Sequence, residues 1–347
     1  MTELLSLTPE ELAAFVKAQG LPAFRAKQLH EWLIRGEDFP AMTNLPEALR
    51  EKLSAVALAQ PVAIERSVRS RIDDTEKLLY RLADGNLIEG VLMRYCHGDT
   101  LCVSTQVGCR MGCAFCASTL GGLVRNLTPG EMLGQIVAVD RMIRPEERRV
   151  HNVVLMGSGE PLDNYENVVK FLRLAIDERG LNLSARAISL STCGLVPAMR
   201  RFADEGLQVT LSVSLHAPDD ETRKKLMPVA NAYSIDEILA ACRYYIEKTG
   251  RRVIFEYALA GGVNCDGSHA DMLAKKLRGM QCHVNLIPLN HVAESALKAP
   301  PPGAVEAFLK RLEERHISAT RRREMGDDIE GACGQLRRRV LETKEER

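Results

Sequence analysis

Apolar residues recur at two different spacings along the chain, and the spacing changes near residue 60. The first 60 residues follow a helical period, and Thr8-Pro9-Glu10-Glu11 is a capping box with proline at the first helical position. A second helical run covers residues 26–34. Short β-type runs follow at residues 77–82, 87–95 and 101–107, separated by turns at Asp84-Gly85-Asn86 and His97-Gly98-Asp99.

Beyond residue 100, short apolar runs alternate with longer amphipathic ones. Capping boxes at Thr128 and Ser234 open two of the helices, and a third helix over residues 164–179 ends at Gly180. Six β/α units in succession predict an α/β fold with a parallel sheet, open or curled into a partial (β/α)6 barrel, with ligands at the carboxyl ends of the strands. The expected strands are residues 101–105, 152–156, 187–191, 209–215, 253–259 and 283–288.

Composition narrows the class of protein. The chain has 46 basic and 46 acidic side chains, so a general affinity for polyanions is not expected, although basic clusters occur at residues 316–323 and 337–339. Each cluster alone is compatible with a solvated face or with phosphate binding. There is no apolar run near the ~18 residues that a membrane span requires. From the first residues we do not expect a secretory signal. We expect a cytoplasmic protein whose ten cysteines are kept reduced unless they bind metal or perform redox chemistry.

Three cysteines lie in one short loop directly after the first expected barrel strand. Cys109, Cys113 and Cys116 are separated by three and then two residues, and the next cysteine or histidine is His151. Structural zinc takes four ligands, as does an iron–sulfur cluster, so three cysteines on a cluster leave one iron open for a substrate or cofactor. A zinc site completed by a distant residue and a loop of unligated thiols are the alternatives.

Polar and glycine-rich segments follow the later strands. Gly157-Ser158-Gly159-Glu160 comes after the second strand, Ser191 ends the third, Ser214-Leu215-His216 the fourth, and Asn290 follows the sixth. Each could be a tight turn or a solvated strand end, but together they would surround one ligand. Far downstream, Cys333 stands between Ala332 and Gly334, which suits a reactive thiol or a small buried hydrophobe.

The three-cysteine loop resembles the signature of radical S-adenosylmethionine enzymes, in which the open iron chelates the methionine moiety. With the segments around Cys102 and Cys333-Gly334-Gln335-Leu336, the resemblance narrows to RNA-methylating radical enzymes that act on carbon-2 of adenine, and it covers nearly the whole chain. Ser158 departs from the methionine usual in that family, and Met325 and Gly331 are smaller departures.

The resemblance implies the cofactors and the roles of individual residues. The cofactors are a 4Fe-4S cluster on Cys109, Cys113 and Cys116 and two equivalents of S-adenosyl-L-methionine per methylation. Cys333 carries the methyl group, Cys102 forms a transient disulfide with it, and Glu89 is the proton acceptor, although Glu89 by sequence alone would be an ordinary surface carboxylate. The remaining five cysteines are expected to be structural. The expected S-adenosylmethionine contacts are Gly159, Glu160, Ser191, Ser214, Leu215, His216 and Asn290.

By the same resemblance the substrates are an adenine in the peptidyl-transferase region of 23S rRNA and the adenine that follows the anticodon in some tRNAs, with an electron donor such as flavodoxin. Methylation of carbon-8 of the ribosomal adenine is the nearest alternative, and a non-catalytic zinc or iron–sulfur RNA-binding protein is another. The expected organisation is an N-terminal helical RNA-binding domain (1–60), a β extension (61–95), the barrel (96–320) and a C-terminal segment (321–347) with the reactive cysteine.

Overall fold

The computed structural model describes residues 1–289, 297–323 and 325–329. Its centre is a ten-stranded sheet in the order β14-β13-β12-β11-β10-β9-β6-β5-β4-β3, parallel from β14 to β6 and antiparallel from β6 to β3. The strands of the sheet are β3 (Val62–Arg69), β4 (Glu76–Leu82), β5 (Leu87–Tyr95), β6 (Gly98–Cys102), β9 (Val150–Leu155), β10 (Ile188–Thr192), β11 (Thr210–Ser214), β12 (Val253–Leu259), β13 (Cys282–Pro288) and β14 (Ala319–Arg321).

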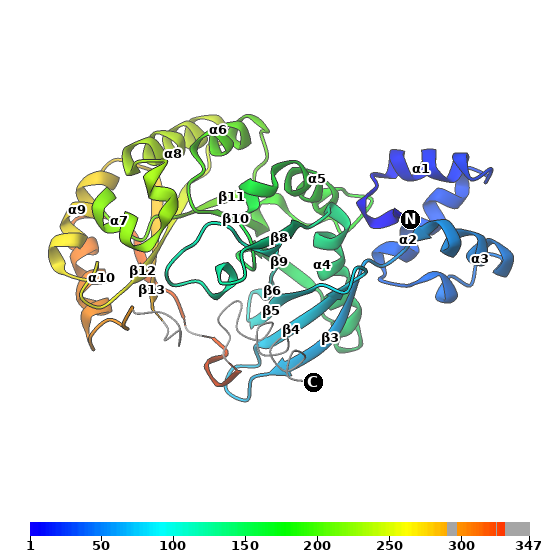
Figure 1. Ribbon diagram of the computed structural model, residues 1–347, viewed down its shortest axis with the longest axis horizontal. Coiled ribbons are helices and arrows are strands. Elements are labelled where there is room, and N and C mark those ends of the chain that lie inside the picture. Colours follow the sequence, from blue (N-terminus) through cyan, green and yellow to red (C-terminus); the bar gives the residue numbers. More distant parts are fainter. Residues whose placement is uncertain (290–296, 324, 330–347) are drawn as a thin grey trace.

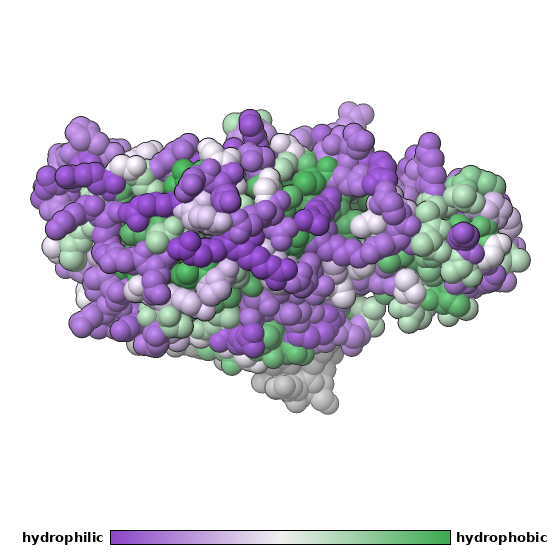
Figure 2. Space-filling model, turned by 90° about the horizontal axis from the view of Figure 1, so that it is seen from above, coloured by the Kyte–Doolittle hydropathy of each residue, from purple (hydrophilic) through white to green (hydrophobic). Residues whose placement is uncertain are grey.

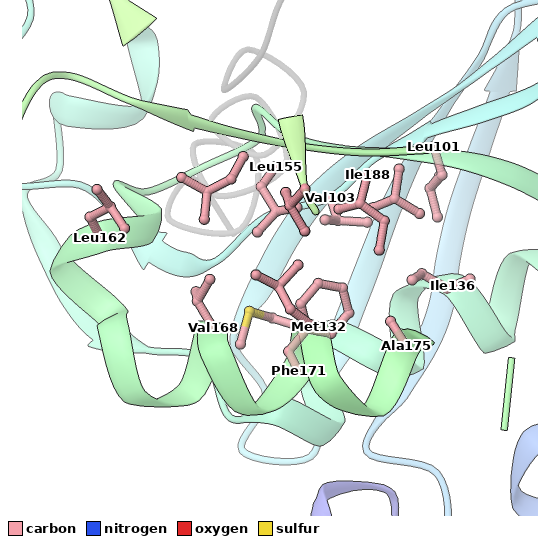
Figure 3. Close-up of a cluster of buried hydrophobic side chains, with 14 of the residues drawn as sticks. Leu101, Val103, Met132, Ile136, Leu155, Leu162, Val168, Phe171, Ala175 and Ile188 are labelled. Atoms are coloured by element: carbon pink, nitrogen blue, oxygen red, sulfur yellow. The ribbon is translucent and has the colours of Figure 1, made fainter. Parts of the chain in front are cut away.

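Helices cover the outer face of the curved parallel part of the sheet (Figure 1). Apolar side chains of α4 and α5 pack against those of β6, β9 and β10, and Met132 and Phe171 lie among them in Figure 3. Burial of this interface stabilises the fold by roughly 25 cal/mol for each Å² of apolar surface removed from water. The helices of the barrel are α4 (Pro129–Ile143), α5 (Tyr165–Ile176), α6 (Val196–Asp204), α7 (Asp220–Leu226), α8 (Ile235–Thr249), α9 (Gly267–Leu277) and α10 (Ala304–Glu314).

The partial barrel and most of its expected elements are confirmed. The capping boxes at Thr128 and Ser234 are both formed, and the strand over residues 253–259 has the expected bounds. The prediction of one strand over residues 101–107 was wrong, because β6 ends at Cys102 and only Val103 continues to bond to β9, its N–H donating to the Val154 carbonyl at 3.0 Å. The backbone of Ser104 is instead bonded to the side chain of Gln135, which receives the Ser104 N–H at 2.9 Å and donates to its carbonyl at 3.0 Å. A seventh parallel strand, β14, was not expected.

Residues after that break form a separate two-stranded ribbon. Strands β7 (Gln106–Gly108) and β8 (Leu123–Asn126) pair antiparallel and enclose the three-cysteine loop. Gly108 has φ +79°, and a Cβ there would lie 2.0 Å from the carbonyl oxygen of Gly122, so only glycine fits. The ribbon therefore fixes both ends of the loop against the carboxyl end of the sheet.

The N-terminal helices form a separate unit at one end of the molecule (Figure 1). They are α1 (Pro9–Ala18), α2 (Phe24–Ile34) and α3 (Glu47–Val56), and the short strands β1 (Thr2–Glu3) and β2 (Ala57–Leu58) pair beside them. The Gly130 N–H donates to Ser6 Oγ at 2.8 Å, and Lys170 pairs with Glu11 at 2.7 Å, so the unit docks on α4 and α5. The expected capping box at Thr8 is formed.

Hydrophilic residues dominate the face of the molecule that Figure 2 shows, with smaller apolar areas between them. Over the part of the chain that the structure describes, no helix combines the length and the apolar character that a membrane span requires.

Candidate active site

The carboxyl ends of the strands and the three-cysteine loop enclose a cavity of about 390 Å³. The thiols of Cys109, Cys113 and Cys116 all line it. The Ala114 N–H donates to the Leu226 carbonyl at 2.9 Å, and the Phe115 ring meets the edge of His216 with ring centroids 4.8 Å apart. These contacts hold the loop over the open end of the barrel.

The three thiols suit a metal cluster better than they suit free thiolates. Burial raises the pKa of Cys109 to about 11 and that of Cys113 to about 12, so without a cation the thiols stay protonated. Within the described residues, no three His, Cys, Asp or Glu side chains are grouped so that they could hold a single metal ion. In a cluster each cysteine binds a different iron, so the ligands need not converge on one point. The donor set therefore fits an iron–sulfur cluster with one open iron.

The glycine-rich turn after β9 lies beside the loop. Gly159 has φ +110°, and a Cβ there would lie 2.7–2.8 Å from Gln106 and Thr105. The buried Glu160 carboxylate accepts the Cys193 N–H at 2.7 Å and the Leu162 N–H at 3.0 Å, and burial raises its pKa. Both predicted residues line the cavity, where a carboxylate suits an ammonium group.

The ends of β10 and β11 form the next part of the wall. Ser191, Ser214 and His216 line the cavity, whereas Leu215 is buried and is not part of the lining. His216 has φ +56°, and its Nδ1 accepts the Ala258 N–H at 2.9 Å, which leaves the proton on Nε2. Burial lowers the pKa of His216 to about 3, so the ring is neutral at physiological pH.

Cys102 lies in the opposite wall, at the end of β6. It is buried, and its side chain lines the cavity next to Val91, Met93 and Met156. This wall is apolar, in contrast to the serines and His216 across the cavity. A thiol and a cluster loop therefore face the same enclosed space.

Glu89 is not the surface carboxylate that its sequence position suggests. It lies on β5, two residues before Val91 and therefore on the same face of the sheet as Cys102, which pairs with Val91. The Glu89 carboxylate is buried and lies 3.7 Å from the Nζ atom of Lys77, which is also buried. It is not part of the cavity lining, although Val91 and Cys102 on the same face are, so it lies beside the cavity further along β5.

Two predicted site residues, Asn290 and Cys333, lie outside the described residues, as does the arginine cluster at 337–339. Cys193, which was expected to be structural, is buried and contributes to the cavity wall.

Sequence reasoning missed two residues at the site, Arg223 and Glu256. Arg223 is fully buried and donates to the carbonyls of Cys193 at 2.6 Å and Leu215 at 3.2 Å, so it holds the ends of β10 and β11 in place. Its sequence context, Arg223-Lys224-Lys225, is typical of a helix surface and gives no signal. Glu256 is a cavity-lining carboxylate inside the apolar run of β12, and that interruption was the available signal. Arg322, which belongs to the basic cluster at residues 316–323, also lines the cavity, from the chain after β14.

Comparisons with known proteins agree with this geometry. Residues 103–313 match the Radical SAM superfamily, and residues 2–59 match the ribosomal RNA large subunit methyltransferase N-terminal domain. A probable dual-specificity RNA methyltransferase RlmN of Lachnospira eligens is 51% identical over 351 residues, which cover 100% of this chain and 99% of that protein. The corresponding protein of Clostridium perfringens strain 13 is 52% identical over 347 residues, or 99% of each chain.

A solved structure is also closely similar. The crystal structure of a radical SAM methyltransferase from Sphaerobacter thermophilus superposes with a TM-score of 0.93 at 46% sequence identity, covering 96% of this chain and 99% of the other. The family matches, the full-length relatives and the cavity with its three-cysteine loop lead to one conclusion: this chain is a radical SAM methyltransferase and belongs to the RlmN family.

Proposed function

We propose that the protein methylates carbon-2 of adenine in RNA, at the peptidyl-transferase region of 23S rRNA and at the adenine 3′ to the anticodon in some tRNAs. The observation that carries the proposal is the shared cavity, in which the three cluster thiols and the Cys102 thiol line one enclosed space. A two-thiol mechanism needs this proximity, because the resolving thiol must reach the sulfur that carries the carbon activated with the help of the cofactors.

The family's cofactors are a 4Fe-4S cluster and S-adenosylmethionine, used twice per methylation. When bound, they supply a methyl group and a carbon radical, which are needed because carbon-2 lies between two ring nitrogens and is too electron-poor to attack a methyl sulfonium. Cys109, Cys113 and Cys116 would hold the cluster, and the contacts of Glu160, Ser191, Ser214 and His216 in the cavity wall would orient S-adenosylmethionine.

The chain's own thiols would then handle the methyl carbon. In the proposed sequence Cys333 holds the carbon that becomes bonded to the adenine, and Glu89 takes the proton from carbon-2. The Cys102 thiolate attacks the Cys333 sulfur and a disulfide forms. The carbon–sulfur bond breaks with its electron pair on the carbon, which takes up a proton to become the methyl group as the methylated base leaves. An external reductant such as flavodoxin would supply the electrons that the cofactors need. A reducing cytoplasm would convert the disulfide between Cys102 and Cys333 back to two thiols.

RNA binding is proposed to use positions around the cavity mouth and the N-terminal unit. Arg322 and Arg323 are exposed and also line the cavity, so they could hold a phosphate while the target base leaves its stack. The N-terminal helices (proposed domain 1–60) carry Arg25, Lys27 and Lys52 as a second contact. Arg25 donates to Gln28 and to the carbonyl of Asn44, which limits its reach.

Mass spectrometry of nucleosides tests the chemistry. RNA from a strain without the gene should lack 2-methyladenosine, and complementation with the wild-type gene should restore it. Appearance of 8-methyladenosine on complementation would instead establish carbon-8 methylation. The Cys333→Ala variant should abolish methylation and keep its iron, whereas Cys102→Ala should accumulate RNA crosslinked to Cys333. Normal turnover by Cys102→Ala would refute the resolving role.

A further inference from the structure

Glu256 is a buried carboxylate in the cavity wall that no role described above uses. It lies on β12, is 3% exposed and lines the cavity. Its Oε1 accepts the side-chain N–H of Asn285 at 3.1 Å, and its Oε2 is buried with no hydrogen-bond partner among the described residues. A buried oxygen that is left unpaired costs about 1–3 kcal/mol, so this atom needs a ligand to complete it.

A row of side chains fixes the direction of the carboxylate. Ser214, Glu256, Asn285 and Thr320 are in register across β11, β12, β13 and β14. The Thr320 hydroxyl donates to Asn285 Oδ1 at 3.2 Å, and His283 Nε2 lies 2.9 Å from the same hydroxyl. Since the Thr320 proton goes to Asn285, His283 Nε2 must donate to Thr320. Every donor in the row thus points toward Glu256, which orders one carboxylate oxygen and leaves the other for the cavity.

The position of Glu256 in the barrel indicates which part of a ligand it meets. The cysteine loop touches His216, whose ring accepts the N–H of Ala258. Glu256 lies two residues before Ala258 on β12, about 6.6 Å deeper along the strand. A ligand anchored at the cysteine loop by its amino-acid end would therefore place its next portion, the sugar, beside Glu256.

The chemistry of the two cavity walls also indicates that Glu256 meets the sugar of the ligand. Glu256 and its neighbour Ser214 form a polar wall, whereas Val91, Met93 and Met156 form an apolar wall that suits a flat base. A carboxylate oxygen accepts hydrogen bonds, and ribose hydroxyls donate them, which is how carboxylates recognise ribose in dinucleotide sites. Burial raises the pKa of Glu256, and the guanidinium of Arg322 opposes that shift and favours the ionised acceptor.

We infer that Glu256 accepts a hydrogen bond from a ribose hydroxyl of S-adenosylmethionine through Oε2, held in place by the Asn285–Thr320–His283 row. The inference rests on the proposed function only for the identity of the ligand. A charge-assisted hydrogen bond of this kind contributes about 1.5–3 kcal/mol. Since 1.4 kcal/mol is a factor of ten, its loss should weaken binding by about 10- to 100-fold.

Equilibrium binding of ligands that lack one ribose hydroxyl tests the inference, and the measurement does not depend on catalytic activity. Anaerobically reconstituted protein is titrated with S-adenosylmethionine and with its 2′-deoxy and 3′-deoxy analogues in a calorimeter. The wild type should bind one of the deoxy analogues about 10- to 100-fold more weakly. Glu256→Ala should bind S-adenosylmethionine more weakly by a similar factor and should no longer discriminate against that analogue. Glu256→Gln keeps the side-chain volume and should show the same loss of discrimination if the alanine variant does not fold.

The matched control is Glu247→Gln, which changes an exposed carboxylate on α8 and should bind all three ligands as the wild type does. Iron content and thermal unfolding are measured for each variant. Undiminished discrimination by a folded Glu256→Gln variant would overturn the inference, as would a wild type that binds all three ligands equally. Failure of the wild type to methylate RNA while it discriminates among the ligands would count against the proposed function and leave the ribose assignment standing.

Discussion

Replacing Lys77 by methionine tests whether the buried ion pair beside the cavity stabilises the sheet. Lys77 on β4 lies opposite Val91, and Glu89 on β5 lies opposite Leu79, so the two charged side chains share one face of the sheet in diagonal positions. Their side chains are 1% and 4% exposed, and Lys77 Nζ lies 3.7 Å from Glu89 Oε2. Methionine keeps much of the volume of lysine and removes its charge.

The magnitude follows from the distance and the burial. At 3.7 Å and an effective dielectric constant near 20, two unit charges attract by about 4.5 kcal/mol. Desolvation of the two groups offsets much of this attraction while both are present, but removing Lys77 alone leaves the Glu89 carboxylate buried without that cation. We expect Lys77→Met to lower the free energy of unfolding by about 3–5 kcal/mol. The double variant Lys77→Met/Glu89→Gln removes both charges and should recover most of this loss.

Urea unfolding followed by circular dichroism gives the free energy of unfolding of the wild type, Lys77→Met, Glu89→Gln and the double variant, which together form a double-mutant cycle. The control is Lys276→Met, which breaks a pair with Asp236 at 2.6 Å whose side chains are 32% and 81% exposed, and which should cost less than about 1 kcal/mol. Additive effects of the two single substitutions would refute the argument, because two side chains that do not couple do not stabilise the sheet as a pair. The argument would also be refuted if Lys77→Met lowered the free energy of unfolding no more than Lys276→Met does.

Three further substitutions test the local geometry. Gly159→Ala should disrupt the turn and abolish S-adenosylmethionine binding measured by calorimetry, because the residue has φ +110° and its Cβ would lie 2.7 Å from Gln106. Burial raises the pKa of Asp140 to about 6, so the folded state binds more protons than the unfolded state between pH 3.8 and 6, and stability falls as the pH rises through that range. Between pH 5.0 and 7.5, the free energy of unfolding of Asp140→Asn, measured in urea, should therefore rise by about 1–2 kcal/mol relative to that of the wild type. A difference between the two proteins that does not change with pH would contradict the raised pKa of Asp140. Arg223→Met should leave the carbonyls at the ends of β10 and β11 without their donor, which lowers the thermal unfolding temperature and weakens S-adenosylmethionine binding together; wild-type values for both would contradict its positioning role.

Local chemistry explains why much of the fold was predictable from the sequence. The capping boxes at Thr8, Thr128 and Ser234 satisfy orphan helix N–H groups with neighbouring side chains, so they are readable without any tertiary information. Strand β12 is apolar apart from Glu256 because helices cover one face and the other lines the barrel, and its bounds were predicted correctly.

The features that the sequence did not predict depend on contacts between residues that are distant in sequence. Residues 101–107 read as one strand because most of them are apolar or β-branched. Gln135, 31 residues after Ser104, instead makes the bonds to the Ser104 backbone that a neighbouring strand would have made. Residues 319–321 read as part of a basic cluster, although their backbone completes the sheet beside β13. Glu256 interrupts the apolar run of β12, which is a sequence signal, but the unpaired oxygen that makes it important depends on the fold and cannot be read from the sequence.

The antiparallel strands of the extension help to form the cavity wall that contains Cys102. In the register of the sheet, Cys102 pairs with Val91 of the antiparallel β5 on one side and with Val154 of the parallel β9 on the other. The thiol thus sits where the extension joins the barrel, and β5 covers an edge of β6 that would otherwise be open. The same extension carries Glu89 and Lys77 onto the face that holds Cys102. The groups proposed to bind the cofactors therefore come from the parallel strands and the proposed resolving thiol from the junction. The proposed two-thiol chemistry thus requires the extension to be part of the same sheet.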